Sequence, residues 1–127
     1  MIESGRAVGK RILLADDQEE VRETVKLLLG VDKHTVVEAR NGREALGLFS
    51  HGQFDLVITD YAMPQMRGDE LALAIKRLSP AQPILMVTGS AERHVLPDGC
   101  IDGFLSKPFM MDDLRQAVAH VLAVVPA

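Results

Sequence analysis

Short apolar runs alternate along the chain with longer segments in which apolar residues recur every three or four positions. The short runs are rich in β-branched residues and predict buried strands, whereas the periodic segments predict amphipathic helices. The expected strands span residues 12–14, 35–39, 56–59, 84–87 and 104–105, and a helical segment follows each of them. Crossovers of this length join parallel strands with right-handed connections. The pattern therefore predicts an α/β fold: a doubly wound, five-stranded parallel sheet with helices on both faces.

Capping residues mark where these helices begin. Asp17 with Glu20, and Asn41 with Glu44, have the three-residue spacing of a capping box. Gly68 is expected to open the third helix. The inward-facing residues expected in the four longer helices are Val21, Val25, Leu28, Leu29, Ala45, Leu48, Phe49, Leu71, Ala74, Ile75, Leu78, Leu114, Val118, Val121 and Leu122.

Length and composition indicate a single domain. We expect residues 1–10 to form a flexible lead-in, residues 11–124 the folded domain and residues 125–127 a tail. The net charge of −4, from 14 Lys and Arg against 18 Asp and Glu, argues against nonspecific binding to nucleic acid or to an anionic membrane. No apolar run approaches the length of a bilayer span, and the lone Cys100 excludes an internal disulfide. A reducing cytoplasm is therefore the expected location.

Polar residues follow the carboxyl ends of four predicted strands. Asp16 and Asp17 follow the first strand, Asp60 the third, Thr88 the fourth and Lys107 the fifth. A parallel sheet brings these ends to one edge, where the ligands of open α/β sheets bind. Each residue alone has an ordinary explanation: a helix cap, a turn former, a strand residue or a solvated lysine. Their joint placement favours one shared site.

The chemistry of this set points to a cation and a phosphate. Three carboxylates in one site repel each other unless a cation neutralises them. Mg²⁺ suits such a set, with Mn²⁺ as the alternative, because it binds few carboxylates together with waters and phosphate oxygens. Lys107 supplies a point charge for a phosphoryl oxygen, and Thr88 supplies a hydroxyl donor.

Four pieces of the sequence, in this order, resemble the receiver domain of bacterial two-component response regulators, the chemotaxis regulators among them. These pieces are Ile12-Leu-Leu-Ala-Asp16-Asp17, Asp60-Tyr-Ala-Met-Pro64-Gln-Met-Arg-Gly68, Val87-Thr88-Gly89 and Gly99-Cys-Ile-Asp-Gly-Phe104-Leu-Ser-Lys107-Pro108-Phe109. The resemblance covers about residues 11–123. It implies a flavodoxin-like strand order of 2-1-3-4-5 and a role in phosphorelay signalling rather than a conventional enzyme activity.

By that resemblance, Asp60 is the phospho-acceptor and takes a phosphoryl group from a sensor histidine kinase or a histidine phosphotransfer protein. Asp17 would bind Mg²⁺ directly and Asp16 largely through water, while Asp60 and the Ala62 carbonyl complete the protein ligands. Self-phosphorylation and slow autodephosphorylation are the only catalysis implied. The phosphorylated domain is expected to control a downstream protein target.

The resemblance also implies a conformational switch. Lys107 would contact the phosphoryl group, Thr88 would move toward it, and Phe104 would turn inward as Thr88 shifts. The Lys107–Pro108 bond matches the cis peptide of the family. A new dianion beside Lys107 gives Thr88 a contact that exists in one state only, as a two-state switch requires.

The chain departs from the family pattern in three places. Ala62 has no polar side chain, where many relatives carry one that influences attack and hydrolysis. Arg67 stands where an acid is common and would make that rim more basic. The segment between Thr88 and Lys107 is short, with a helical piece expected only at 91–96, which bears on whether the domain is a monomer or a weak dimer. The histidines, all expected at the surface, are His34, His51, His94 and His120.

Other functions fit parts of the pattern. A Mg²⁺-dependent phosphatase or mutase with a strand-end aspartate nucleophile would carry a second acid two residues later, where Ala62 stands. A degenerate receiver would bind partners without phosphorylation, but the acids, the threonine and the lysine are all present. A dinucleotide-binding module is disfavoured because no Gly-x-Gly-x-x-Gly follows the first strand.

Overall fold

The computed structural model describes residues 8–89 and 99–124. Within this range, five strands form one parallel sheet in the order β2-β1-β3-β4-β5. The strands are β1 (Arg11–Ala15), β2 (Thr35–Ala39), β3 (Leu56–Asp60), β4 (Ile84–Thr88) and β5 (Gly103–Ser106). The helices are α1 (Glu19–Gly30), α2 (Gly42–Ser50), α3 (Gly68–Leu78) and α4 (Met111–Val124). The predicted fold class and strand order are confirmed.

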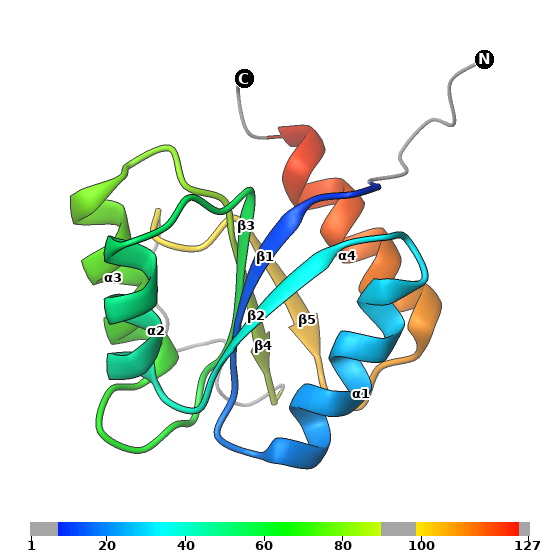
Figure 1. Cartoon of the computed structure of the whole chain (residues 1–127), viewed down its shortest axis with the longest axis horizontal. Helices are drawn as coiled ribbons and strands as arrows, with labels where there is room; N and C mark the ends of the chain where they lie inside the picture. The colour runs from blue at the N-terminus through cyan, green and yellow to red at the C-terminus, as the bar shows by residue number, and fades with distance from the viewer. Residues whose placement is uncertain (1–7, 90–98, 125–127) are drawn as a thin grey trace.

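The helices cover both faces of the sheet, with α1 and α4 on one face and α2 and α3 on the other (Figure 1). Successive strand residues point to opposite faces, so the central strands contribute to two hydrophobic clusters. Ile12 and Leu14 of β1 pack in the cluster under α1 and α4, whereas Leu13 and Ala15 pack under α2 and α3. Because both faces are covered, β3 and β4 are buried along their whole length.

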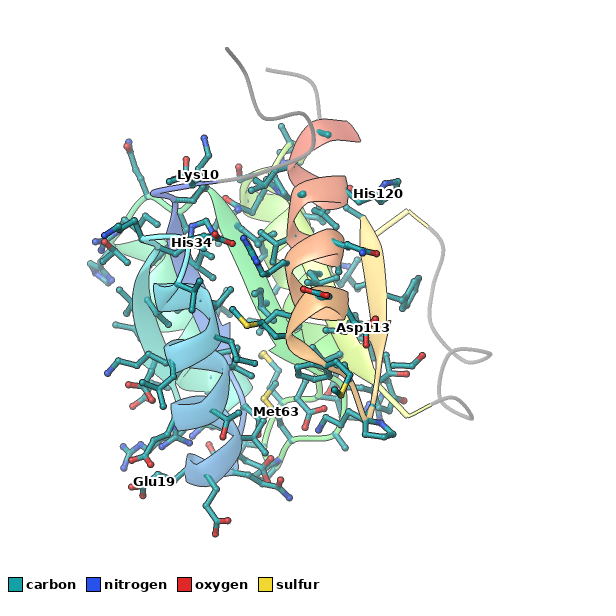
Figure 2. All side chains as sticks on the ribbon, turned by 90° about the vertical axis from the view of Figure 1, so that its right-hand side faces the viewer. Lys10, Glu19, His34, Met63, Asp113 and His120 are labelled. Atoms are coloured by element: carbon teal, nitrogen blue, oxygen red, sulfur yellow. The ribbon has the colours of Figure 1, made fainter. Side chains whose placement is uncertain are left out.

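The loops gather at two opposite sides of the sheet, one beyond the carboxyl ends of the strands and one beyond their amino ends. The strand arrows point toward the bottom of Figure 1, where the chain leaves each strand, and we call this the carboxyl edge. The opposite end, where the strands start, is the amino edge. In Figure 2, Glu19 at the start of α1 lies toward the carboxyl edge, whereas Lys10 and His34 lie together at the amino edge.

The first helix begins differently from the prediction. The expected capping box of Asp17 and Glu20 is wrong, because α1 starts at Glu19 and Gln18 occupies the N-cap position without a side-chain cap. Instead, Asp16 Oδ1 accepts a hydrogen bond from the Gln18 N–H at 2.9 Å. The acid one position earlier therefore satisfies this amide, and Asp17 is exposed.

The buried face of α3 is rotated slightly from the predicted one. Leu71 and Ile75 are buried as predicted, but Leu78 is 62% exposed and Ala72 is buried in addition. The buried positions of α3 are 68, 71, 72 and 75. A stripe with this spacing continues at residue 79 rather than 78, so Leu78 lies off the core-facing side.

Most of the remaining helix predictions are confirmed. Asn41 caps α2 by accepting the Glu44 N–H at 2.8 Å, although Glu44 itself accepts the N–H of Arg40 rather than that of Asn41. Gly68 opens α3 as expected. The other predicted inward residues that are buried are Val25, Leu29, Ala45, Phe49, Leu114, Val118 and Val121. Those that are half-buried are Val21, Leu28, Leu48, Ala74 and Leu122.

The histidines are mostly at the surface. His51 and His120 are exposed, but His34 is half-buried and its Nδ1 accepts the Lys10 N–H at 2.9 Å, so the surface prediction is wrong for His34. His94, the expected helical piece at 91–96 and most of the expected lead-in and tail lie outside the described residues. Among the helices that the structure describes, none has the length and apolarity needed to cross a membrane.

Candidate functional site

Four strand ends bring the predicted site residues together at the carboxyl edge. Asp60 and Thr88 are the last residues of β3 and β4, Asp16 directly follows β1, and Lys107 directly follows β5. The Lys107 N–H donates to the Thr88 carbonyl at 2.9 Å, so the sheet pairing continues past the end of β5. The juxtaposition expected from a parallel sheet is therefore present.

Three acids form a compact cluster at this edge. Asp16, Asp17 and Asp60 each offer a carboxylate oxygen, and these oxygens lie within 4.8 Å of one another. Asp16 is 3% exposed and Asp60 7%, whereas Asp17 is exposed. An all-oxygen donor set with one solvent-exposed member fits a hard cation such as Mg²⁺, which keeps several of its waters when it binds.

The electrostatics of the cluster are unbalanced. Burial raises the pKa of Asp60 above its usual range, and the charge of Asp16 adds to the rise, while the hydrogen bond and charge of Lys107 oppose it. Burial also raises the pKa of Asp16, against the opposing N–H of Gln18 and charge of Lys107. Both shifts show desolvated carboxylates with too little positive charge around them. A cation that enters the cluster would therefore be bound favourably.

One carboxylate oxygen of Asp60 is held from two sides. Lys107 Nζ lies 3.1 Å from Asp60 Oδ1, and the Tyr61 N–H donates to the same oxygen at 3.0 Å. The Lys107 side chain is 34% exposed, so it is partly open to solvent. These contacts fix the orientation of the Asp60 carboxylate and place a positive charge next to it.

The predicted switch residues lie on β4 and β5. Thr88 is fully buried, and its hydroxyl donates to the carbonyl of Gly89. Phe104 is half-buried on β5, which is the edge strand of the sheet beside β4. The Lys107–Pro108 peptide is cis, as predicted. The Thr88 hydroxyl is thus bonded to the main chain of the next residue.

The loop after β3 packs back onto the end of that strand. Ala62 is exposed, whereas Met63 is buried in the cluster under α2 and α3. The Gly68 N–H donates to the Tyr61 carbonyl at 2.8 Å. A Cβ at Gly68 would lie 2.2 Å from the Asp60 carbonyl oxygen, so this close approach requires glycine.

Arg67, at the end of the same loop, is paired. Its Nε lies 3.0 Å from Asp69 Oδ1, and its main-chain N–H donates to Glu70 Oε1 at 2.9 Å. Because Asp69 offsets the charge of the guanidinium, the rim carries less added positive charge than the sequence suggested.

The structure adds a contact that the sequence patterns did not single out. Arg22 is 8% exposed, and its Nη1 donates to the Asp16 carbonyl at 2.9 Å. A signal was present, because Arg22 lies three residues before Val25 and seven before Leu29, on the buried stripe of α1. A charged residue on such a stripe indicates a buried partner.

Comparison with known proteins agrees with this geometry. The profile of the response regulator receiver domain matches residues 12–119. The transcriptional regulatory protein TcrA of Mycobacterium tuberculosis is 32% identical over 113 residues, which cover 87% of this chain and 45% of that protein. The sensor histidine kinase AruS of Pseudomonas aeruginosa is 37% identical over 124 residues, which cover 91% of this chain and 12% of that protein.

A solved structure gives the same result. The crystal structure of the response regulator protein TrrA from Thermotoga maritima, in complex with Mg(2+)-BeF, matches with a TM-score of 0.84 and 35% identity, over 88% of this chain and 98% of that one. The chain spans less than half the length of TcrA and of AruS. From its sequence, its strand order and its acid cluster, the chain belongs to the response regulator receiver domain family and is a receiver domain of two-component systems.

Proposed function

We propose that Asp60 accepts a phosphoryl group from the phosphohistidine of a sensor histidine kinase or a histidine phosphotransfer protein. The setting of its carboxylate supports this most directly. Asp60 ends β3, one of its oxygens is held by Lys107 and Tyr61, and two further acids lie within 4.8 Å. A nucleophile fixed in orientation beside a cluster that needs a cation suits phosphoryl transfer.

Mg²⁺, or Mn²⁺ in its place, fits the acid cluster. Asp17 would bind it directly and Asp16 largely through water, with Asp60 and the Ala62 carbonyl completing the protein ligands. When bound, the ion supplies the charge neutralisation that the acids and an incoming phosphoryl group require. The oxygen-only donor set supports this assignment, as does the related TrrA, which was solved with Mg(2+)-BeF.

The residues of the chain mainly position the reacting groups. An oxygen of the Asp60 carboxylate attacks phosphorus, the P–N bond to the donor imidazole breaks, and its electron pair stays on the imidazole nitrogen. The product is an acyl phosphate on Asp60. Lys107, which already lies 3.1 Å from Asp60 Oδ1, is close enough to pair with a phosphoryl oxygen.

The acyl phosphate would then act on Thr88. The Thr88 hydroxyl now donates to the Gly89 carbonyl, and a phosphoryl oxygen would offer it a charged and therefore stronger acceptor. Exchange of one acceptor for the other would move Thr88, and Phe104 on the neighbouring strand would turn inward. A contact that differs between two states is what couples phosphorylation to conformation.

The proposed activity is signalling rather than turnover of a substrate. Ala62 provides no acid where a phosphatase or mutase would need one, so self-phosphorylation and slow autodephosphorylation are the expected reactions. TcrA is named as a transcriptional regulator and AruS as a sensor kinase. We infer that the phosphorylated domain, a monomer or weak dimer spanning residues 11–124, controls a protein target in the cytoplasm.

Intact-mass spectrometry after incubation with acetyl phosphate and MgCl₂ tests the acceptor. The wild type should gain one phosphoryl group, and Asp60→Asn should gain none. The matched control is Asp55→Asn, which removes an acid just before the start of β3 and should label like the wild type. Equal labelling of the wild type and Asp60→Asn would overturn the assignment.

A further inference from the structure

A buried arginine lies directly behind the acid cluster. Arg22 of α1 is 8% exposed, its Nη1 donates to the Asp16 carbonyl at 2.9 Å, and its Nε donates to Glu38 Oε1 at 3.3 Å. Glu38 lies on β2 and also accepts from Lys26, whose side chain is 55% exposed. Arginine is seldom buried unless it is paired, and here its partners come from the end of β1 and from β2.

Asp16 is held at three points. Its N–H donates to the Ala39 carbonyl at 3.1 Å, its carbonyl accepts from Arg22, and its Oδ1 accepts from the Gln18 N–H at 2.9 Å. Since α1 has no side-chain N-cap, these bonds define the connection that carries Asp16 and Asp17. The bond from Arg22 ties this connection to the body of α1.

We propose that Arg22 is a positioning residue for the cation site. By holding the Asp16 carbonyl, while Glu38 orients its guanidinium group, Arg22 keeps Asp16 and Asp17 directed toward Asp60 before a divalent cation binds. The inference rests on the proposed function of the acid cluster. A guanidinium group can donate to the carbonyl and to the carboxylate at once in a fixed geometry, whereas the ammonium of lysine is a flexible point donor. Ligands held in place before binding lose less conformational entropy when the ion arrives.

A positioning role and a purely electrostatic role of Arg22 predict opposite changes in Mg²⁺ affinity. The positive charge of Arg22 by itself repels a divalent cation, so a purely electrostatic role predicts that its removal strengthens Mg²⁺ binding. A positioning role predicts that its removal weakens binding. The sign of the change in the Mg²⁺ dissociation constant therefore distinguishes the two roles.

Mg²⁺ binding can be measured without phosphorylation. Tyr61 is the single tyrosine of a chain without tryptophan, and it follows Asp60 directly, so a change in tyrosine fluorescence on addition of MgCl₂ is the first readout. Isothermal titration calorimetry provides a second readout. Arg22→Met should weaken Mg²⁺ binding by about tenfold or more, and Arg22→Lys should weaken it by a smaller factor although the charge is kept.

Three further variants complete the experiment. Lys26→Met removes an exposed cation that also pairs with Glu38, and it should change the dissociation constant by less than about twofold. Glu38→Ala and Glu38→Gln remove the same negative charge, but only the glutamine keeps an oxygen acceptor for Arg22 Nε, so Mg²⁺ binding should weaken more in Glu38→Ala than in Glu38→Gln. An unchanged or tighter dissociation constant in the Arg22 variants that fold, judged by circular dichroism, or equal weakening in the two Glu38 variants, would overturn the inference.

The same measurements separate this inference from the proposed function. If the wild type binds Mg²⁺ and is labelled at Asp60 while folded Arg22 variants bind Mg²⁺ normally, only the inference about Arg22 fails. If the wild type neither binds Mg²⁺ nor becomes labelled, the proposed function fails, and the inference fails with it.

Discussion

Both edges of the sheet gather charged side chains, but they balance those charges differently. At the amino edge, Asp32 accepts from both Nε and Nη2 of Arg115, at 2.9 and 3.0 Å. Asp102 accepts from Lys76 Nζ and from the Ile84 N–H, each at 2.8 Å. These acids have cations or main-chain donors of their own, and the pairs join segments that are far apart in the sequence.

At the carboxyl edge the acids lie close together and outnumber the cations that contact them. Asp16, Asp17 and Asp60 lie within 4.8 Å of one another, and Lys107 contacts Asp60. Burial raises the pKa values of Asp16 and Asp60, because desolvation outweighs the favourable contacts that they receive. Charge at a sheet edge is therefore not by itself a functional signal. Charge that the protein leaves unbalanced is the stronger indication of a ligand.

The largest loss of stability is expected when the Asp32–Arg115 ion pair at the amino edge is removed. Asp32→Asn removes the charged partner of Arg115 and should lower the free energy of unfolding by about 2 kcal/mol, less than for a fully buried pair because the Arg115 side chain is 31% exposed. Thermal unfolding followed by circular dichroism should show a fall in Tm of roughly 7 °C. Mg²⁺ binding should not change. A loss below about 0.5 kcal/mol would show that this pair is not structural.

A smaller change in stability is expected when Mg²⁺ neutralises the acids at the carboxyl edge. Mg²⁺ at ten times its dissociation constant should stabilise the wild type by about 1.4 kcal/mol, because the ion binds only the assembled cluster. The corresponding rise in Tm is roughly 5 °C. Asp17→Asn should lose most of this rise, and Asp55→Asn, at the amino edge, should keep it. An equal rise in the wild type and Asp17→Asn would contradict metal binding at the cluster.

The smallest effect concerns the metal-free protein, in which replacing an acid of the cluster is expected to raise the stability rather than lower it. Because the pKa of Asp16 is raised in the folded state, ionisation of this group opposes folding as the pH rises through that pKa. Asp16→Asn should therefore have a Tm higher than the wild type by about 2 °C at pH 7 in EDTA.

The pH dependence provides the control. The difference between Asp16→Asn and the wild type should shrink as the pH falls toward about 4, where the aspartate of the unfolded chain also takes up its proton. If Asp16→Asn were less stable than the wild type at pH 7 without metal, the negative charge of Asp16 would not oppose folding as inferred. Asp32→Asn, at the amino edge, should be destabilised under the same conditions.

The sheet and its edge could be predicted from the sequence because the signals are local. Leu56, Val57 and Ile58 form a short apolar run rich in β-branched residues, which favours a buried strand, and the strand ends at an acid, Asp60. Parallel pairing then places the strand ends together, and Lys107 does lie 3.1 Å from Asp60 Oδ1.

The errors arose where two local solutions compete. Asp17 and Asp16 are both able to satisfy an amide at the start of α1, and the structure uses Asp16 for the Gln18 N–H. Leu78 fits an apolar stripe by type, but the stripe of α3 is rotated toward Ala72. Neither choice is decided by residue type, because each depends on how the helix is seated against the sheet.

Arg22 could not be assigned partners from spacing alone. Its acceptors are the Asp16 carbonyl and Glu38, which come from the ends of two neighbouring strands. The sequence shows only that a charged residue interrupts the buried stripe of α1. Which strands approach that position is set by the tertiary fold.

The close approach of Gly68 to the Asp60 carbonyl has a mechanical consequence. A Cβ at Gly68 would lie only 2.2 Å from that oxygen, so no flexible side chain separates Asp60, the proposed phospho-acceptor, from the first turn of α3. A shift in the main chain at Asp60 would therefore press directly on this helix. If the proposed phosphorylation of Asp60 moved this main chain, α3 and the surface it exposes would move with it.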